Sequence, residues 1–305
     1  MSTKKKYLIS IVGATAIGKT ALSIKLAQHF NTEIISCDSR QFFKEMTIGT
    51  AVPDQDELTA AQHHFIQNKS IFDTYNVGSF ERDALKKLDT LFQKHSIVIM
   101  VGGSGMYVDA VINGLDNFPT VDKSIRLKLT ERLNTEGLES LQRQLKELDP
   151  ITYHKIALDN PQRVSRALEI CIGSGKPYSS FLNQDKNKRP FTTISIGLTA
   201  ERALMYERIN KRVDIMIDNG LLDEAKELYA HKHLNALNTV GYKELMMYFD
   251  GEWNLPFAIS EIKKNTRRFA KRQVTWFKRN ANTTWFDYNY SLNSIIEFIN
   301  TQTKS

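Results

Sequence analysis

Residues 13–20, GATAIGKT, have the spacing of a phosphate-binding loop, in which four residues separate a glycine from Gly-Lys-Thr. In such a loop, backbone N–H groups and the start of the next helix surround an anion. Lys19 would reach the terminal phosphate oxygens, and the Thr20 hydroxyl is the usual protein ligand for Mg²⁺. The loop consists of Gly13, Ala14, Thr15, Ala16, Ile17, Gly18, Lys19 and Thr20. It is typical of nucleotide-binding and ATP-binding proteins, and the spacing alone leaves open whether phosphate is transferred, hydrolysed or released.

Two further polar side chains follow apolar stretches that predict strands. Asp38 follows TEIIS, and Ser104 follows SIVIMV. Open α/β sheets bind ligands at the carboxyl ends of their strands, so both side chains are candidates for one crevice. Asp38 could instead cap a turn or helix, and Ser104 could cap a helix. A nucleotide hydrolase usually carries an Asp at the end of an apolar strand to hold Mg²⁺, whereas IVIMVGGSG ends in glycines.

A basic stretch near the carboxyl end indicates a second kind of partner. Residues 260–280 carry one acid, Glu261, and the cations Lys263, Lys264, Arg267, Arg268, Lys271, Arg272, Lys278 and Arg279. A solvated helix face normally mixes charges of both signs, so this bias favours contact with nucleic acid phosphates. A merely basic surface is the alternative. Trp276 could anchor the helix to the core or stack on bases, and we expect the anchor. Arg163 and Arg166 form a smaller basic pair on a predicted helix.

These residues need a scaffold of alternating strands and helices. Strands are predicted at 7–12, 32–36, 96–101 and 192–198, with helices at 18–29 and 79–94. This pattern indicates an α/β fold, a P-loop NTPase-like core whose parallel sheet is flanked by helices. We assign 1–117 and 191–305 to this core with its basic C-terminal helices. Residues 118–190 show helical periodicity without a strand and predict an all-helical insertion domain.

Some boundaries of the predicted helices are marked by particular residues. In the insertion, Asn160-Pro161 predicts a helix start and Gly173 its end. A later helix is expected from a Thr199 cap to Gly220, and another from Pro256 to about residue 280.

The bulk composition is that of a globular protein. The 305 residues are 41% apolar and 25% charged, enough for one large domain or two modest ones. The net charge of +7 leans towards an anionic partner. Cys37 and Cys171 lack metal-ligand spacing, so a zinc site is not expected and a reducing compartment is favoured. The amino-terminal apolar run is short and continues into the phosphate loop, so we interpret it as a strand and expect a cytoplasmic protein without a membrane span.

Taken together, the motifs resemble those of the tRNA dimethylallyltransferase family. The similar blocks, in chain order, are GATAIGKT, DSRQFFKEMTIGTAVP, GGSGMYVDAVINGL, DNPQRVSRALEICIGSGKP, RINKRVDIMIDNGLLDEAKEL, VGYKEL and RRFAKRQVTWFKR. Ala14 and Ile17 replace a Pro and a Ser of the family loop, where the backbone does the binding. Phe43 stands where a Tyr is common, and Ser104 replaces a Thr and keeps the hydroxyl.

The resemblance implies transfer of a dimethylallyl group from dimethylallyl diphosphate to N6 of the adenosine 3′-adjacent to the tRNA anticodon. Diphosphate would then be a leaving group, and Mg²⁺ the cofactor. In this interpretation Asp38 is the general base, Ser104 aligns the reactants, Lys19 binds diphosphate, and Arg208 or Arg212 clamps it. We expect a monomer.

The resemblance also implies a set of tRNA contacts, and the insertion would close over the anticodon stem-loop. The implied residues are Asp38, Ser39, Arg40, Gln41, Ser104, Arg126, Gln162, Arg163, Val164, Ser165, Arg166, the run 238–243 with Gly241, Tyr242 and Lys243, and the run 271–278 with Lys271, Arg272, Gln273 and Lys278.

Two other functions fit parts of the sequence. A small-molecule kinase would bind ATP on the same loop and would not need the basic helix. A non-catalytic RNA-binding protein would not need an intact Lys19-Thr20 pair or Asp38.

Overall fold

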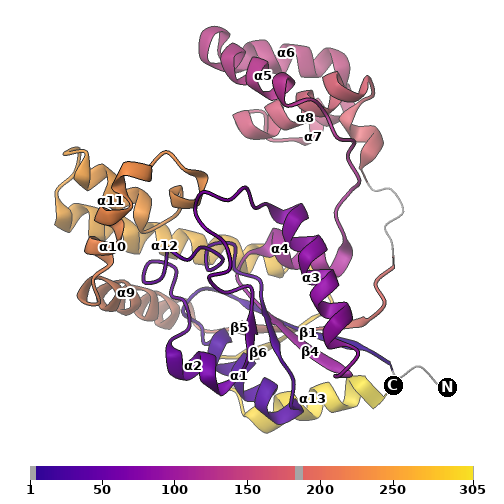
Figure 1. Cartoon of the computed structure of the whole chain (residues 1–305), viewed down its shortest axis with the longest axis vertical. Helices are drawn as coiled ribbons and strands as arrows, with labels where there is room; N and C mark the ends of the chain where they lie inside the picture. The colour runs from indigo at the N-terminus through magenta and orange to yellow at the C-terminus, as the bar shows by residue number, and fades with distance from the viewer. Residues whose placement is uncertain (1–4, 183–187, 305) are drawn as a thin grey trace. The chain divides into compact units, whose positions relative to one another are not determined.

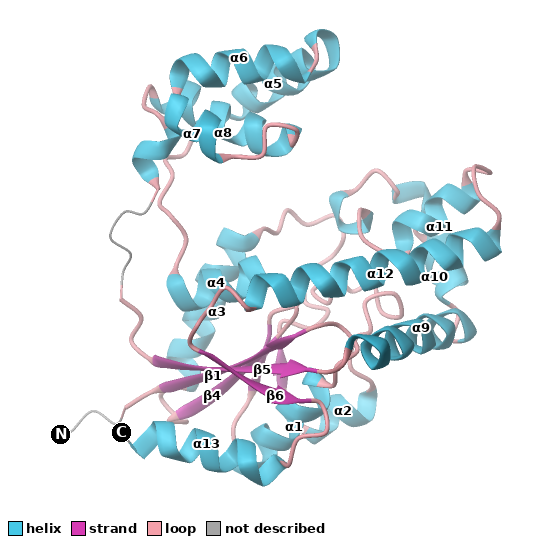
Figure 2. Ribbon diagram, turned by 180° about the vertical axis from the view of Figure 1, so that it is seen from behind, coloured by secondary structure: helices cyan, strands magenta, loops and turns pink. Residues whose placement is uncertain are grey.

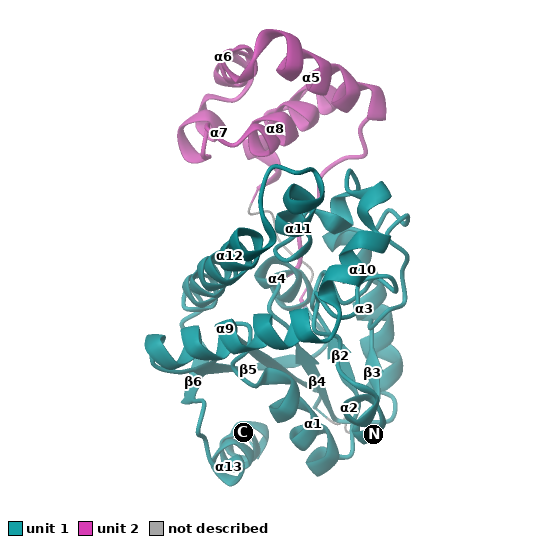
Figure 3. Cartoon of the chain, turned by 90° about the vertical axis from the view of Figure 1, so that its left-hand side faces the viewer, with its two compact units in different colours: residues 1–113, 189–305 teal, residues 114–188 magenta. Residues whose placement is uncertain are grey.

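A computed structural model describes residues 5–182 and 188–304. The chain divides into two compact units (Figure 3). Unit 1 comprises residues 1–113 and 189–305, and unit 2 comprises residues 114–188. The sequence places the corresponding boundaries at 117/118 and 190/191, so the observed insertion begins and ends slightly earlier in the chain.

Unit 1 is built on a six-stranded sheet of order β3-β2-β4-β1-β5-β6, in which every neighbouring pair is parallel (Figure 1). The strands are β1 (Tyr7–Gly13), β2 (Ile34–Ser36), β3 (His63–His64), β4 (Ile97–Val101), β5 (Thr192–Thr199) and β6 (Thr283–Asp287). The α-helices of this unit are α1 (Lys19–Phe30), α2 (Gln55–Ala60), α3 (Val77–Leu91), α4 (Gly105–Asn113), α9 (Arg202–Asp218), α10 (Leu221–Glu227), α11 (Tyr242–Phe249), α12 (Leu255–Phe277) and α13 (Leu292–Lys304).

Both faces of the sheet are covered by helices (Figure 2). Along β1, Ile9 and Ile11 pack with α1 and α13, whereas Leu8 and Val12 pack with α3, α4 and the end of α12. Successive side chains of a strand point to opposite faces, so a strand buried on both sides is a continuous apolar run. This explains why β1 was predictable from sequence. No described helix has both the length and the apolar character needed to cross a bilayer.

A smaller helical layer, α9 to α12, packs around the loop that follows β2. Its buried core includes Met46 of that loop together with Val213, Leu221, Tyr242 and Ile262. The short 3-10 helices Tyr229–His231 and Asn235–Leu237 connect α10 to α11. The loop after β2 therefore has a hydrophobic core of its own, separate from the sheet.

Glu224 of α10 fixes this loop through its carboxylate. Its two oxygens accept backbone N–H groups of Thr47, Ile48 and Gly49 at 2.8–2.9 Å, and Oε1 also accepts the Tyr242 hydroxyl at 2.6 Å. The Tyr242 ring lies so close to Gly49 that a Cβ there would be 2.6 Å from ring carbons. Burial is the first cause that raises the pKa of Tyr242, and the nearby Glu224 raises it further.

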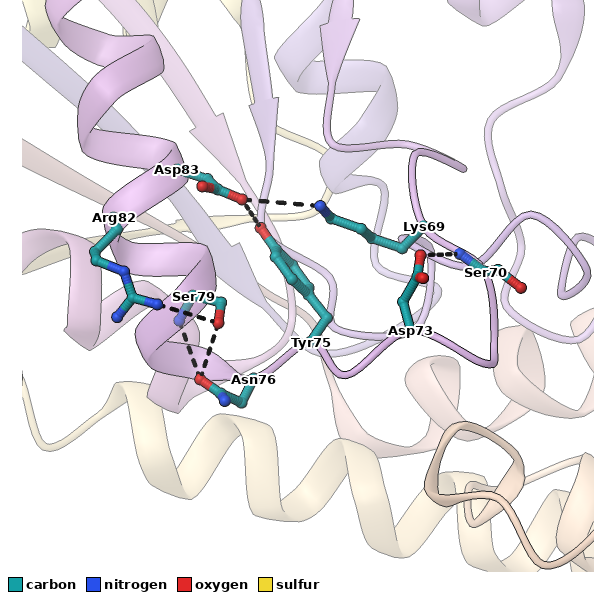
Figure 4. Close-up of polar contacts among 8 residues, drawn as sticks. All are labelled: Lys69, Ser70, Asp73, Tyr75, Asn76, Ser79, Arg82 and Asp83. Atoms are coloured by element: carbon teal, nitrogen blue, oxygen red, sulfur yellow. Dashed lines mark hydrogen bonds and ion pairs between the residues drawn. The ribbon is translucent and has the colours of Figure 1, made fainter. Parts of the chain in front are cut away.

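The segment before α3 supports the same loop from its other side. The backbone of Lys69 donates to Phe42 O at 2.9 Å and accepts from Lys44 N at 2.8 Å. Tyr75 donates its hydroxyl to Asp83 at 3.0 Å, and the Lys69 ammonium lies 4.5 Å from the Tyr75 ring (Figure 4). The segment is thus tied to α3, and the loop that carries the expected site residues is held between two supports.

Unit 2 is helical throughout its described residues. It contains α5 (Lys123–Glu136), α6 (Leu138–Leu148), α7 (Pro150–Lys155), α8 (Pro161–Ser174) and the 3-10 helix Tyr178–Phe181. Leu129, Leu141, Leu145 and Leu168 form its buried core. The predicted helix start is confirmed, because the Asn160 side chain accepts from Arg163 N at 3.1 Å.

Two predicted helix boundaries are wrong. Helix α8 continues past Gly173, where a Cβ would lie 2.4 Å from Val121, and it is Gly175, with φ of 66°, that ends it. Helix α9 is capped by Glu201 rather than Thr199, because Thr199 remains in β5. Strands β3 and β6 and helix α13 were not predicted from the sequence pattern.

Replacing Glu224 by Gln should lower the free energy of unfolding by about 2 kcal/mol, because the amide has one accepting oxygen for four donors and loses the charge that strengthens these bonds. Equilibrium unfolding in urea measures the change. Glu227→Gln, at an exposed position of the same helix, is the matched control and should stay within about 0.5 kcal/mol of the parent. An unchanged urea midpoint for Glu224→Gln would contradict this role.

Candidate active site at the phosphate loop

A cavity of about 820 Å³ opens at the carboxyl ends of β1, β2 and β4. It is lined by the phosphate loop, by Asp38 and Gln41 after β2, by residues 50–54, and by Gly102 and Gly103 after β4. Helix α9 also contributes lining residues, which are Leu204, Glu207, Arg208, Lys211, Arg212 and Ile215. The structure therefore brings together the loop, Asp38 and both candidate arginines, as the sequence predicted.

The phosphate loop is held by cations that bind its own oxygen atoms. Lys19 Nζ donates to Ala14 O at 2.7 Å, and Arg208 Nε donates to Ala16 O at 2.8 Å. Arg212 Nη1 donates to Thr15 Oγ1 at 3.2 Å. Helix α1 begins at Lys19 without a side-chain cap, so its first N–H groups are available to an anion at the helix start.

Lys19 sits in an environment that weakens its hold on a proton. Burial is the largest cause and lowers the pKa of Lys19 to about 8; Asp38 opposes this shift and Arg212 adds to it. Burial also lowers the pKa of Arg212, while Asp38 and Glu57 raise it. Asp38 is thus close enough to both cations to partly compensate their charge, and a bound anion would complete that compensation.

Asp38 both caps a turn and lies on the wall of the cavity. Its Oδ1 accepts from Arg40 N at 3.1 Å, which is the turn contact that the sequence left open. The same side chain lines the cavity that the phosphate loop also lines. The two interpretations of Asp38 are compatible, because a carboxylate has further lone pairs once one oxygen accepts from the backbone.

Ser104 has a different role from the simple helix cap that the sequence allowed. Its Oγ accepts from Ser39 N at 3.0 Å and donates to Ser39 Oγ at 3.0 Å. These bonds join the loop after β4 to the loop after β2. Ser104 is not among the residues that line the cavity wall, so its hydroxyl acts on the neighbouring loop in this structure.

Arg40 and Gln41 also connect loops. Arg40 Nη1 donates to the carbonyls of Asn235 and Ala236 at 3.0 and 3.1 Å. Gln41 Nε2 donates to Ala51 O at 2.8 Å. Gln41 therefore fixes backbone that lines the cavity, whereas Arg40 ties the loop after β2 to the 3-10 helix Asn235–Leu237. Composition and spacing did not reveal either contact.

The basic helix α12 has two kinds of cation. Lys263 pairs with Asp214 at 2.5 Å, and Arg267 Nη1 donates to Asn210 at 2.7 Å, so these two hold α12 against α9. Arg268, Lys271 and Arg272 are exposed, as are Lys278 and Arg279. Trp276 is half-buried, packs with the sheet core and donates Nε1 to Asp109 at 2.9 Å, which confirms it as an anchor.

Several residues implied as RNA contacts are buried, among them Gly241 and Phe277. Val164 belongs to the core of unit 2, Tyr242 is enclosed beside Gly49, and Gln273 is 5% exposed. Contacts with RNA at these positions would have to come from neighbouring side chains or from the backbone. Their neighbours Gln162, Arg163 and Lys243 are exposed.

In unit 2 a buried carboxylate lies close to two of the arginines that the resemblance implies as tRNA contacts. Glu169 Oε2 lies 3.0 Å from Arg166 Nη1 and 3.8 Å from Arg126 Nε. The Arg166 guanidinium also stacks 5.6 Å from the centre of the Phe118 ring. Two cations thus share one anchor, which a sequence scan for basic residues does not detect.

A sequence profile of the family described as IPP transferase matches residues 41–280. The chain belongs to the IPP transferase family. The tRNA dimethylallyltransferase of Flavobacterium johnsoniae is 62% identical over 306 aligned residues, covering 98% of this chain and 99% of that relative. The tRNA dimethylallyltransferase 1 of Bacteroides fragilis is 49% identical, and the alignment covers 92% of this chain and 93% of that relative.

Solved structures of other IPP transferases agree with this fold. The tRNA isopentenylpyrophosphate transferase of Bacillus halodurans has a TM-score of 0.74 and 37% identity, covering 98% of this chain and 97% of its own. A eukaryotic dimethylallyltransferase acting on tRNA has a TM-score of 0.81 and 27% identity, covering 93% of this chain and 74% of that one. The predicted α/β phosphate-loop fold and transferase class are confirmed, and the kinase alternative gains no support.

The lowered pKa of Lys19 makes anion binding by this IPP transferase pH-dependent. Only the protonated amine attracts a diphosphate, and its pKa is about 8 before the anion binds. Affinity for inorganic pyrophosphate should therefore fall as pH rises above 8, approaching about tenfold per pH unit. Calorimetric titration at several pH values measures this.

Lys19→Arg is the matched control, because a guanidinium stays charged over this range. The protonation of pyrophosphate itself changes with pH in the same way for both proteins. The ratio of their two affinities at each pH therefore reports the protonation of Lys19 alone. Parallel curves for the two proteins would show that Lys19 keeps its proton and would contradict the prediction.

Proposed function

We propose that this IPP transferase transfers a dimethylallyl group from dimethylallyl diphosphate to N6 of the adenosine 3′-adjacent to the anticodon of tRNA, with release of diphosphate. One observation carries the proposal: a phosphate loop with three cations shares its cavity with the carboxylate of Asp38. Cations suit a departing diphosphate, and a carboxylate suits the proton of an incoming amine. The names of the relatives support the same reaction.

In this reaction the bond from the allylic carbon to diphosphate breaks while the bond from that carbon to N6 forms. Lys19, Arg212 and the loop N–H groups stabilise the negative charge that develops on diphosphate. N6 is a weak nucleophile because its lone pair is delocalised into the purine. Asp38 holds the N6 amine by a hydrogen bond and accepts its proton as the new bond forms.

Magnesium fits the oxygen chemistry of this site. No group of three or more His, Cys, Asp or Glu residues able to hold a metal occurs among the described residues, so protein side chains alone do not build a cation site. Thr20 lines the cavity and offers one hydroxyl. We propose that Mg²⁺ is held by Thr20 together with diphosphate oxygens and water, since Mg²⁺ binds few protein ligands in phosphate sites. The bound ion would neutralise diphosphate charge.

The RNA would be bound by the exposed cations of both units. In unit 1 these are Arg268, Lys271 and Arg272 on α12. In unit 2 they include Arg126 and Arg163, together with the half-exposed Arg166. The target base has to leave its stack to reach a cavity, so the protein must bind an extruded adenosine. We place the enzyme in the cytoplasm as a monomer that engages the anticodon stem-loop.

The decisive experiment incubates the protein with Mg²⁺, unmodified tRNA and one of two labels, either on the allyl group of dimethylallyl diphosphate or on the γ-phosphate of ATP. The allyl label should appear in RNA, on N6 of the predicted adenosine. Transfer of the phosphate label to RNA would instead show a kinase that acts on RNA. Absence of the allyl label from RNA would contradict the proposed transfer.

Asp38→Asn should lower kcat by about 10²–10⁴-fold, because an amide orients N6 but cannot accept its proton. Binding of tRNA should change little, since only one contact is altered. Single-turnover transfer with saturating tRNA and dimethylallyl diphosphate measures the loss. Asp56→Asn, an exposed carboxylate on α2, controls for the removal of one charge and should keep full turnover. Near-normal kcat for Asp38→Asn would reduce Asp38 to its turn contact.

The outward cations of α12 should contribute to RNA binding through phosphate contacts. In the triple variant Arg268→Ala, Lys271→Ala and Arg272→Ala, the slope of log K against log salt should become shallower by about 0.7–0.9 per lost contact. Filter binding of tRNA across a salt series gives the slope. Lys263→Ala is the control, because its ammonium already pairs with Asp214. An unaltered slope in the triple variant would leave α12 as an ordinary basic surface.

A further inference from the structure

Gln273 occupies the inner side of α12, directly next in sequence to two exposed cations. The buried residues in this part of the helix are Ala270, Gln273 and Phe277, spaced as one helical face. Lys271 and Arg272 lie on the exposed side. Gln273 is therefore a polar residue in an apolar stripe, and a buried side-chain amide needs hydrogen-bond partners.

Both ends of the Gln273 amide have a partner, and the two partners lie on different loops. Oε1 accepts the N–H of Thr15 in the phosphate loop at 2.8 Å. Nε2 donates to the carbonyl of Gly103, in the loop after β4, at 2.9 Å. The two contacts need one acceptor and one donor at the end of a single side chain, which an amide supplies and a carboxylate, an amine or an apolar group does not.

Gly103 is shaped to receive this amide. A Cβ at Gly103 would lie 2.2 Å from Gln273 Nε2 and 3.9 Å from Lys19 Nζ. The amide thus fills the space that a side chain at position 103 would need, immediately beside the lysine that faces diphosphate.

The amide contact also determines which donors of the phosphate loop face the cavity. Thr15 has its N–H bound by Gln273 and its hydroxyl bound by Arg212. Ala14 packs with Ala270 and Val274 of α12. One side of the loop is therefore fixed to α12, and this leaves the N–H groups at the start of α1 for the anion.

We propose that Gln273 is a positioning residue for the diphosphate site, joining the phosphate loop to the loop after β4, and that its side chain is not an RNA contact. The inference rests on the proposed function for the identity of the two ligands. It revises the implied tRNA contact at this position. It also divides α12 into an outer face for RNA and an inner face that holds the catalytic loops.

The test measures the binding of pyrophosphate and the binding of tRNA separately. Gln273→Met keeps the length of the side chain and removes both hydrogen bonds. It should weaken binding of inorganic pyrophosphate with Mg²⁺ by about tenfold or more, the effect of losing one to two buried hydrogen bonds. The dissociation constant for unmodified tRNA should stay within about twofold. In turnover, KM for dimethylallyl diphosphate should rise while KM for tRNA does not. A tenfold loss of tRNA affinity with unchanged pyrophosphate binding would overturn the proposal.

Lys271→Ala is the matched variant on the outer face and should show the opposite pattern, with weaker tRNA binding and normal pyrophosphate binding. Gly103→Ala disrupts the same contact between Gln273 and Gly103 from the other partner. It replaces Gln273→Met in the test if Gln273→Met has a lowered melting temperature. Its methyl group displaces the amide, so it should also weaken pyrophosphate binding and spare tRNA binding. A folded Gly103→Ala protein with normal pyrophosphate affinity would refute the positioning role.

Failure of the positioning role of Gln273 can be distinguished from failure of the proposed function. If the loop bound ATP instead, the protein would still bind pyrophosphate and Gln273→Met would still weaken that binding. If the parent protein did not bind pyrophosphate, the proposed diphosphate site itself would be contradicted.

Discussion

Cations that are brought together to bind a diphosphate repel one another until the anion arrives, and much of the site is arranged around that constraint. Lys19 and Arg208 each donate to a carbonyl of the phosphate loop, while Arg212 donates to the hydroxyl of Thr15. Asp38 raises the pKa of Lys19 against the larger effect of burial. These oxygen atoms provide enough compensation to hold the cations in place and leave their attraction for an anion strong. Asp38 therefore partly compensates the charge of Lys19, in addition to its proposed role as the base.

Such an arrangement works only if the loops themselves are held, and residues far apart in sequence do this. Glu224 binds the backbone at 47–49, while Ser104 and Ser39 join the loops after β4 and β2. Gln273 joins the phosphate loop to Gly103. Several stretches that appear as separate motifs along the chain are thus parts of one hydrogen-bonded support around a single cavity. This accounts for motif residues that are buried and cannot touch a substrate.

Elements and site residues could be predicted from the sequence where a local pattern of residues determines them. Strand β1 is apolar because both of its faces are covered, and Asp38 lies on the cavity because parallel strands end at one edge of a sheet. Strand β6 was missed because it is short, half-exposed and rich in threonine at the edge of the sheet. The Ser104–Ser39 contact spans 65 residues and Glu224 reaches back 175 to 177 residues, distances at which spacing rules carry no information. A glutamine at an apolar helical position was the one local signal of the Gln273 contact.

Helix α12 shows why residue type alone does not separate the roles of neighbouring positions. Lys271, Arg272 and Gln273 are consecutive, and a basic motif suggests one role for all three. A helix advances about 100° per residue, so consecutive side chains point in different directions. Lys271 and Arg272 face solvent while Gln273 faces the phosphate loop. In the proposed reaction, a helix with RNA-binding cations on its outer face and loop contacts on its inner face would fix the position of the RNA relative to the diphosphate. Since N6 must approach the allylic carbon within about 3–3.5 Å for reaction, this shared support is itself a contribution to catalysis.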